Sequence, residues 1–291
     1  MSTPRRPGGT TPARVLVIDD CAEFSRDDVL ATEEPLEIRV AAGGEVNTVA
    51  TTMRTPGADF ELAAGFLRTE GVIGDRRDVR RIEYCVDPSG PADQLYNTVT
   101  VQLAASHVPD LAAVERYGTV SSACGVCGKA NLDALHARGV EAVPSAEGVA
   151  VDLDTLYELP DALRAAQGNF TATGGIHAAG LFTPTGDALA VREDVGRHNA
   201  VDKVVGWAVL KGAQLPDGAV LVVSGRAGYE IVQKAVAARI PVVCAVSAPS
   251  SLAVAVAEEF GVTLVGFLRG RRANVYSGAH RILRRAAAPS H

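Results

Sequence analysis

The sequence predicts an α/β protein in which a small α+β domain precedes a larger layered domain. Three unbroken apolar runs, at residues 219–223, 241–246 and 262–267, are separated by segments of helical length, which is typical of buried parallel strands. Upstream, residues 36–52 alternate apolar and polar positions around a Gly43-Gly44 pair, which is typical of a hairpin. A chain of 291 residues is also long enough to form two domains.

The N-terminal part divides into a leader and the small domain. Residues 1–14 are rich in Pro, Gly, Thr and Arg and lack apolar periodicity, so we expect a flexible leader that buries little. In the small domain, residues 15–110, a short helix over residues 59–67 follows the hairpin, and Gly71 is placed to end it. Two further alternating runs complete this domain as strands, over residues 79–86 and 97–103.

The larger domain is predicted over residues 111–291. Its apolar strands are joined by Ala/Val-rich segments, at about residues 229–238 and 250–260, which are long enough for right-handed helical crossovers. In such sheets ligands bind beyond the carboxyl ends of the strands, where the small, polar segments 224–226 and 247–249 emerge. We therefore expect a ligand crevice at this edge.

Composition and charge exclude several classes of protein. A net charge of −6 argues against nucleic acid as a partner, because phosphate binding usually shows as a basic domain or stripe. No apolar run is long enough for a membrane span, and no apolar core follows the N-terminal arginines to make a signal peptide. The five cysteines are odd in number and mostly isolated, unlike a disulfide framework. We expect a cytoplasmic protein with reduced thiols.

The sharpest chemical signal is the loop Cys124-Gly125-Val126-Cys127-Gly128. Its glycines let the two thiols approach each other, and Lys129 beside a helix N-terminus would favour a reactive thiolate. Such a pair can be half of a zinc site, a redox dithiol, or a relay that holds a persulfide and passes its outer sulfur on. Zinc would also need a histidine such as His177 or His198, because the other cysteines are isolated. Spacing alone leaves all three roles open.

Two further motifs place polar residues beside glycines. In residues 173–179 the glycines let backbone amides approach a ligand, although a turn without a ligand would look the same. His177 lacks the acid two positions later that a zinc deaminase needs, so deaminase chemistry is disfavoured. The run at residues 192–199 precedes a helix and is either a functional site or a capping and salt-bridge cluster. It contains two acids, Glu193 and Asp194, and the basic residues Arg197 and His198.

A basic segment follows the last apolar strand. It consists of Phe267, Leu268, Arg269, Gly270, Arg271 and Arg272. Guanidinium groups suit phosphate oxygens, and the segment lies at the carboxyl end of a strand, where ligands bind. A phosphate or nucleotide site and a solvated basic turn are the two readings of this segment.

Together these stretches resemble the formate dehydrogenase accessory sulfurtransferase family, the FdhD proteins. The resemblance begins near residue 34 and spans nearly the whole chain. It rests on the runs MRTP, CGVCG, TGGIHAA, REDVGRHNAVDK, SGR, SAPSS and GFLRGRRANVY, in that order. It implies a homodimer in which a three-layer domain, related to cytidine deaminases, follows a small N-terminal domain.

The resemblance also implies an activity. Members of the family take sulfur as a persulfide from a cysteine desulfurase and deliver it to the molybdenum bis-guanine-dinucleotide cofactor, after which formate dehydrogenase becomes active. Here Cys124 and Cys127 would carry the sulfur, with Cys124 holding the persulfide. The segment from Phe267 to Arg272 would bind the cofactor as cargo, and no permanently bound metal is expected. A molybdenum-cofactor chaperone and a zinc-dependent hydrolase remain as alternatives.

Overall fold

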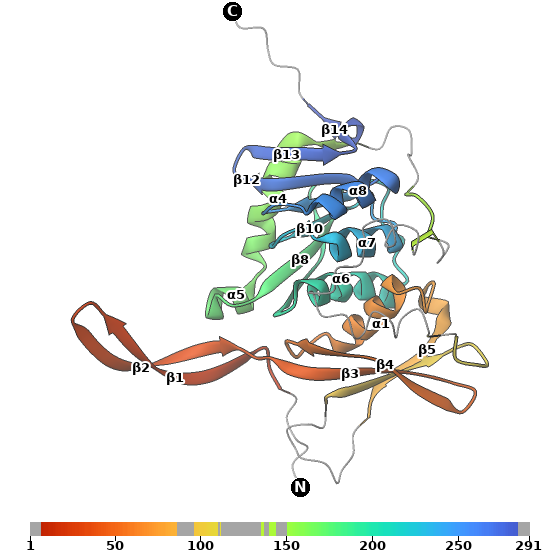
Figure 1. Cartoon of the computed structure of the whole chain (residues 1–291), viewed down its shortest axis with the longest axis horizontal. Coiled ribbons are helices and arrows are strands. Elements are labelled where there is room, and N and C mark those ends of the chain that lie inside the picture. The colour runs from red at the N-terminus through yellow and green to blue at the C-terminus, as the bar shows by residue number, and fades with distance from the viewer. Residues whose placement is uncertain are drawn as a thin grey trace, which may run out of the picture.

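A computed structural model describes residues 7–85, 96–109, 111, 135–136, 140–143 and 150–284. Within these ranges the chain forms a four-stranded sheet, a six-stranded sheet and a projecting two-stranded hairpin, with helices between and around the two larger sheets (Figure 1). Within the same ranges no helix is both long and apolar enough to cross a membrane. The predicted mixed α/β class is confirmed.

The small N-terminal sheet has the strand order β4-β3-β6-β5. Its strands are β3 (Glu34–Ala42), β4 (Glu45–Arg54), β5 (Val79–Tyr84) and β6 (Thr98–Leu103). The predicted hairpin of β3 and β4 turns at Gly43 and Gly44, whose φ angles of 59° and 91° favour glycine. Alternate residues of β3 point to one face, so Leu36, Ile38 and Val40 are all fully buried there.

Helix α1 (Asp59–Thr69) joins the small sheet to the larger unit. One face of α1 packs on the small sheet through Leu62 and Leu67, and another crosses helix α6 (Arg197–Lys211). The two helices meet backbone to backbone at Gly65 and Gly206. A methyl group on Gly65 would lie 1.7 Å from the Asp202 carbonyl oxygen, so only glycine permits this approach.

The larger sheet has the strand order β13-β12-β11-β10-β8-β9. Its strands are β8 (His177–Phe182), β9 (Ala188–Asp194), β10 (Val220–Val223), β11 (Val242–Ala245), β12 (Thr263–Arg269) and β13 (Arg272–Ser277). The three predicted apolar strands β10, β11 and β12 are parallel neighbours, as expected. The sheet as a whole is mixed, because β8, β9 and β13 are each antiparallel to the strand beside them.

Helices cover both faces of this sheet and make a three-layer unit. Helices α6, α7 (Tyr229–Ala237) and α8 (Ser251–Glu259) pack on one face. Helix α4 (Leu153–Ala165) packs on the other, with Leu156, Leu159 and Leu163 in one cluster with strand residues such as Val222. Helix α5 (Gly168–Thr173) follows α4. The short strands β7 (Val151–Asp152) and β14 (Ile282–Leu283) pair with each other, and β7 contacts α4.

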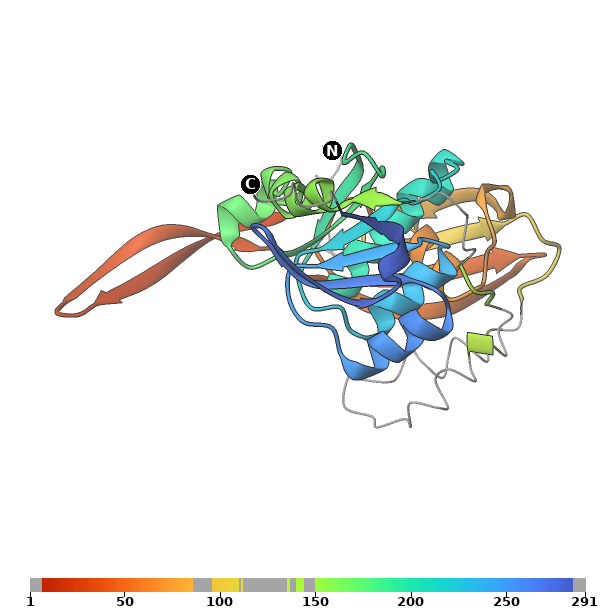
Figure 2. The ribbon, with the colours of Figure 1, turned by 90° about the horizontal axis from the view of Figure 1, so that it is seen from above.

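The expected leader over residues 1–14 needs correction. Strand β1 (Thr10–Asp19) begins inside it and pairs along its whole length with β2 (Ala22–Ala31). Figures 1 and 2 show this hairpin projecting from the body as an arm. The hairpin has no regular alternation of buried and exposed residues that would predict it, because both strands are largely exposed. The domain boundary predicted at residue 110 falls at a residue outside the described ranges and stays a prediction.

Candidate functional site at the carboxyl edge of the large sheet

The carboxyl ends of the three parallel strands bring the predicted loops together. The loop after β10 and the loop after β11 form a bridge between Ala227 and Pro249, and Ser250 N donates to Ala227 O at 3.0 Å. The loop after β11 also contacts the end of β12, where Phe267 N donates to Ser247 O at 3.1 Å. Backbone hydrogen bonds therefore connect the loops at the edge where the sequence predicted a ligand crevice.

His177 reaches this edge because β8 runs antiparallel to β10 and begins where β10 ends. A Cβ atom on Gly225 would lie 3.3 Å from His177 Nδ1, so glycine leaves room for the imidazole. The next backbone amide, Ala178 N, donates to Ser224 Oγ at 2.9 Å. Burial and the positive charge of nearby Arg197 lower the pKa of His177. The imidazole is therefore held beside the loop after β10 in its neutral form near pH 7.

The N-terminus of α6 places Arg197 and His198 at the same edge. His198 Nε2 lies 3.3 Å from Glu230 Oε2 in the first turn of α7. This contact lowers the pKa of the Glu230 carboxyl to about 2. The edge thus carries a histidine-carboxylate pair next to the half-buried His177, with two helix N-termini contributing positive potential.

The basic segment forms the turn between β12 and β13 and splits into two groups. Phe267, Arg269 and Arg272 line a pocket of about 440 Å³. The other members point elsewhere: Leu268 is fully buried in the core, and Arg271 lies 2.5 Å from Asp154 of α4. Gly270, with φ of 53°, makes the tight turn itself. The structure therefore brings three of the six predicted cofactor-binding residues together in one pocket.

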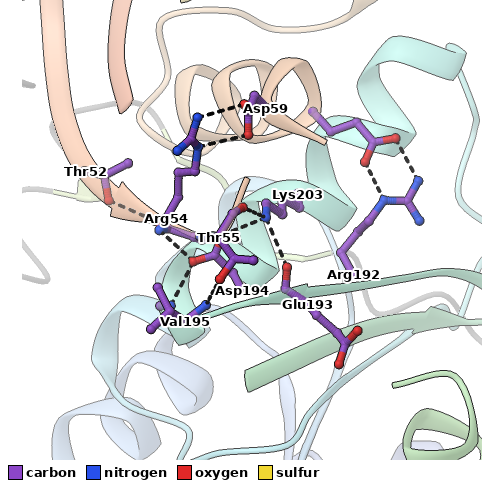
Figure 3. Close-up of polar contacts among 12 residues, drawn as sticks. Thr52, Arg54, Thr55, Asp59, Arg192, Glu193, Asp194, Val195 and Lys203 are labelled. Atoms are coloured by element: carbon purple, nitrogen blue, oxygen red, sulfur yellow. Dashed lines mark hydrogen bonds and ion pairs between the residues drawn. The ribbon is translucent and has the colours of Figure 1, made fainter. Parts of the chain in front are cut away.

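Asp194 and Lys203 form a buried network below this edge (Figure 3). Lys203 Nζ lies 2.7 Å from Asp194 Oδ2 and donates to the carbonyl oxygens of Thr55 and Glu193 at 2.9 and 3.0 Å. Asp194 also accepts from the Thr55 amide at 3.2 Å. Both side chains are at most 2% exposed, so this ion pair is enclosed between the small sheet's β4–α1 connection and the large sheet.

Arg54 makes a second buried network, which the sequence analysis did not predict. Its guanidinium is fully buried and holds Asp59 through two hydrogen bonds of 3.2 and 3.1 Å, with Glu34 at 3.2 Å (Figure 3). Tyr84 Oη donates to the same Asp59 carboxylate at 3.0 Å. The available signal was an arginine five residues before an acid at a helix start, and that spacing is too common to be specific.

The sequence left two interpretations of residues 192–199 open, a functional site and a capping and salt-bridge cluster, and the run contains residues of both kinds. Glu193 accepts hydrogen bonds from Asn169 N at 2.9 Å and Phe170 N at 2.8 Å, and Asp194 is bound within the network above. These two acids join elements together. Arg197 and His198 instead lie at the carboxyl edge, where the sequence predicted a ligand crevice.

Cys124 and Cys127 lie outside the described residues. Of the three remaining cysteines, Cys21 and Cys85 are exposed and Cys244 is buried in β11, as its apolar surroundings predicted. Burial raises the pKa of the Cys244 thiol to about 12, so it stays protonated and unreactive. Among the residues that the structure describes, no group of three or more His, Cys, Asp and Glu side chains is arranged to hold a metal ion.

Fold and site together define a three-layer α/β protein that carries arginine and histidine side chains at the carboxyl edge of its large sheet. The chain belongs to the FdhD/NarQ family, whose profile matches residues 31–283. It is 51% identical over 280 residues to a protein of Streptomyces avermitilis named sulfur carrier protein FdhD, covering 96% of this chain and 98% of that protein. A Mycobacterium tuberculosis protein of the same name is 51% identical over 263 residues, covering 89% and 93% of the two chains.

A solved structure has the same fold. It is the crystal structure of a Desulfotalea psychrophila chain assigned as a formate dehydrogenase accessory protein. The TM-score is 0.71 at 26% sequence identity, and the match covers 94% of this chain and 99% of that one. The predicted family is therefore confirmed along nearly the whole chain.

Proposed function

We propose that this chain is a sulfur carrier that a formate dehydrogenase needs to become active. It takes persulfide sulfur from a cysteine desulfurase and delivers it to the molybdenum bis-guanine-dinucleotide cofactor. The observation that carries the proposal is the 51% identity, over 96% of the chain, to a relative named as a sulfur carrier. The Cys124-Cys127 pair adds the thiol chemistry that such a carrier requires.

Loading needs only a thiolate and a donor persulfide. The Cys124 thiolate attacks the outer sulfur of the donor, the donor's S–S bond breaks, and the donor cysteine leaves as a thiolate. No oxidant or reductant is consumed in this step. Release of the outer sulfur as sulfide takes two electrons, which Cys127 supplies if its thiolate attacks Cys124 and closes a disulfide. A thiol reductant then restores both cysteines.

The cofactor, as cargo, is assigned to the carboxyl edge of the large sheet. The pocket lined by Phe267, Arg269 and Arg272 offers two guanidinium groups to the phosphates of a guanine dinucleotide. The imidazole rings of His177 and His198 stand at the same edge and offer hydrogen-bonding nitrogens there. This is the position at which layered α/β sheets bind ligands, beyond the carboxyl ends of parallel strands.

The proposal includes the finer assignments of fold and setting. We assign the three-layer unit to the cytidine-deaminase-like folds and the protein to the cytoplasm, as a homodimer. A zinc-dependent hydrolase is less well supported, because Ala179 occupies the position two residues after His177 where a zinc deaminase carries its glutamate.

Complementation separates a sulfur carrier from a cofactor chaperone. A strain that lacks its own copy of this protein is supplied with wild type, Cys124→Ala or Cys85→Ala, and formate dehydrogenase activity is measured in extracts. We expect Cys124→Ala to restore less than about a hundredth of the wild-type activity, because the sulfur acceptor is lost. Cys85→Ala, which removes an exposed cysteine outside the motif, is the matched control. Full activity with Cys124→Ala would favour a chaperone.

A further inference from the structure

A cavity of about 830 Å³ lies between the small N-terminal unit and the amino edge of the large sheet. Its walls come from the end of α1, the loop at residues 74–77, the end of α6 and the loops that precede β10 and β11. These loops lie at the ends of β10 and β11 opposite to the predicted ligand edge, so the cavity is separate from the arginine pocket at the β12–β13 turn. Its volume is in the usual range for small-molecule sites, which often form between structural units.

The cavity combines positive charge with an apolar wall. In the described part of the chain, four arginines and two aspartates line it, although the whole sequence has a net charge of −6. The arginines are Arg68, Arg76, Arg77 and Arg239. The apolar wall consists of side chains from α6 and from the loops after α6 and α7, namely Val205, Ala208, Val209, Leu215 and Ala238. Guanidinium groups suit phosphate oxygens, and an apolar wall suits the carbon body of a ligand.

Arg68 has no counter-ion of its own. Its side chain is half-buried in the last turn of α1, and among the described residues its guanidinium has no hydrogen bond or ion pair. Burial and the positive charge of Arg239 lower the pKa of Arg68, and Asp75 acts in the opposite direction. The Asp75 carboxylate is held by Arg77, whose Nη2 lies 2.6 Å from Asp75 Oδ2. A partly desolvated charge beside a like charge is destabilising until an anion compensates it.

Arg239 brings a second guanidinium to the same place. It lines this cavity and an adjoining cavity of about 430 Å³, as Arg68 does. Its Nη2 pairs with Glu141, and within the described ranges its other N–H groups have no partner. The Arg239 backbone has φ of 58° directly after the C-cap of α7, where glycine is the usual residue. A strained backbone conformation of this kind is typical of functional sites.

We propose that this cavity is a second ligand site, which binds a phosphate monoester with its phosphate between Arg68 and Arg239 and its carbon body on the apolar wall. The phosphate dianion supplies the negative charge that the two guanidinium groups lack. Inorganic phosphate would supply the same charge but leave most of the cavity unfilled, so the carbon body adds affinity. Because Arg68 belongs to the small unit and Arg239 to the large one, the bound ligand would also hold the two units together. This inference does not depend on sulfur transfer.

The first test is calorimetric titration of the full chain with phenyl phosphate and with inorganic phosphate. Every protein carries Arg269→Gln, which weakens the separate arginine pocket at the β12–β13 turn. We expect added Arg68→Met to weaken phenyl phosphate binding at least about tenfold, because a charged hydrogen-bond donor is lost. Arg80→Met is the matched control, since Arg80 is exposed on β5 and does not line the cavity. Phenyl phosphate that bound no more tightly than inorganic phosphate would contradict the role of the apolar wall.

The second test measures urea unfolding in phosphate-free buffer. Arg68→Met should unfold at the wild-type urea midpoint or above it, because the substitution removes an unpaired, partly desolvated charge and keeps the apolar stem. Phenyl phosphate should raise the midpoint of wild type and leave that of Arg68→Met unchanged. A lower midpoint for Arg68→Met without ligand overturns the proposal, because Arg68 would then serve the fold, for example by complementing the C-terminus of α1. A wild-type chain that binds neither probe also overturns it.

Discussion

Asp194 is enclosed in protein, and each of its carboxylate oxygens has at least two partners. Oδ2 meets Lys203 and the Thr55 amide, and Oδ1 accepts from Gly196 N at 2.8 Å and Asn199 Nδ2 at 3.0 Å. A carboxylate that is saturated in this way has no free lone pair for a ligand. Its role is to hold the β4–α1 connection against the sheet that carries the ligand edge.

Lys203→Met tests this role. The substitution keeps the length of the side chain but leaves the Asp194 carboxylate buried without its counter-charge. We expect the free energy of unfolding to fall by about 3–5 kcal/mol, the usual cost of breaking a buried pair from one side. Lys211→Met, at the exposed end of the same helix, is the control and should stay within about 0.5 kcal/mol of wild type. Equal urea midpoints for all three proteins would contradict this role.

The two pocket arginines at the turn between β12 and β13 should contribute to ligand binding. Arg269 and Arg272 line the pocket, whereas Arg271 is held by Asp154 and lies over the Tyr157 ring at 5.2 Å. Calorimetric titration with guanosine diphosphate, a fragment of the proposed cargo, should show about tenfold weaker binding for Arg269→Gln and for Arg272→Gln. Arg271→Gln is the matched control and should bind as wild type does. An Arg271→Gln protein that bound as weakly as the other two would place the ligand elsewhere.

At the scale of elements, the crossing of α1 and α6 determines how closely the small sheet approaches the large one. Gly65 and Gly206 let the two backbones touch. A Cβ on Gly206 would lie 1.8 Å from the Glu61 carbonyl oxygen, and no side-chain rotation can relieve a clash with backbone. The glycine pair therefore fixes the distance between the helices that connect the two units.

Gly65→Ala should destabilise the protein by about 3 kcal/mol, the upper part of the usual range for overpacking. Gly168→Ala in α5 adds the same methyl group where no atom lies within 4 Å, and it should change stability by less than about 0.5 kcal/mol. Urea unfolding followed by far-ultraviolet circular dichroism measures both. If Gly65→Ala unfolded at the wild-type midpoint, the close helix crossing would be wrong.

The sequence predicted the elements whose pattern is set by burial on a regular period. The β3–β4 hairpin, α1, β5, β6 and the three parallel strands with their helices were all expected close to their observed positions. Strand β8 was not predicted as a strand, because Ala178, Ala179 and Gly180 have weak strand preference. The run at residues 173–179 was interpreted as a glycine-rich approach to a ligand or as a turn. Helix α4 was not predicted, because it contains Pro160. The β1–β2 hairpin was not predicted, because its turn has Asp20 at φ of 47° where a glycine would have indicated a turn.

For the basic segment at residues 267–272, the sequence could not show which side chains face the pocket. On a regular strand, successive side chains point to opposite faces, so the sequence alone would show which side chains point outward. Here the register shifts between Gly266 and Arg269, and Phe267 has φ of 51°, so the alternation is broken. Leu268 consequently packs in the same core cluster as Val265, three positions earlier, although strict alternation would place these two side chains on opposite faces. Phe267 and Arg269 line the pocket. The composition of the segment predicted the chemistry, but only its backbone shows which side chains can supply it.

At the scale of the whole molecule, the packing of the two larger sheets supports the carboxyl edge of the large sheet. The large sheet is covered by helices on both faces, and the small sheet is fastened to it through α1, the Asp194–Lys203 pair and an ion pair from Arg192 to Glu61, whose Nη2 and Oε1 are 2.7 Å apart. We therefore expect the loops at the carboxyl edge to hold the proposed anionic cargo without a rearrangement of the fold.

The central claim is that this chain carries sulfur on Cys124, and intact-protein mass spectrometry tests it most directly. Wild type, Cys124→Ala, Cys127→Ala and the control Cys85→Ala are incubated with a cysteine desulfurase and cysteine. We expect wild type and Cys85→Ala to gain one sulfur atom that a thiol reductant removes, and Cys124→Ala to gain none. The claim is contradicted if Cys124→Ala gains sulfur as wild type does, or if no variant gains sulfur and tightly bound zinc is found.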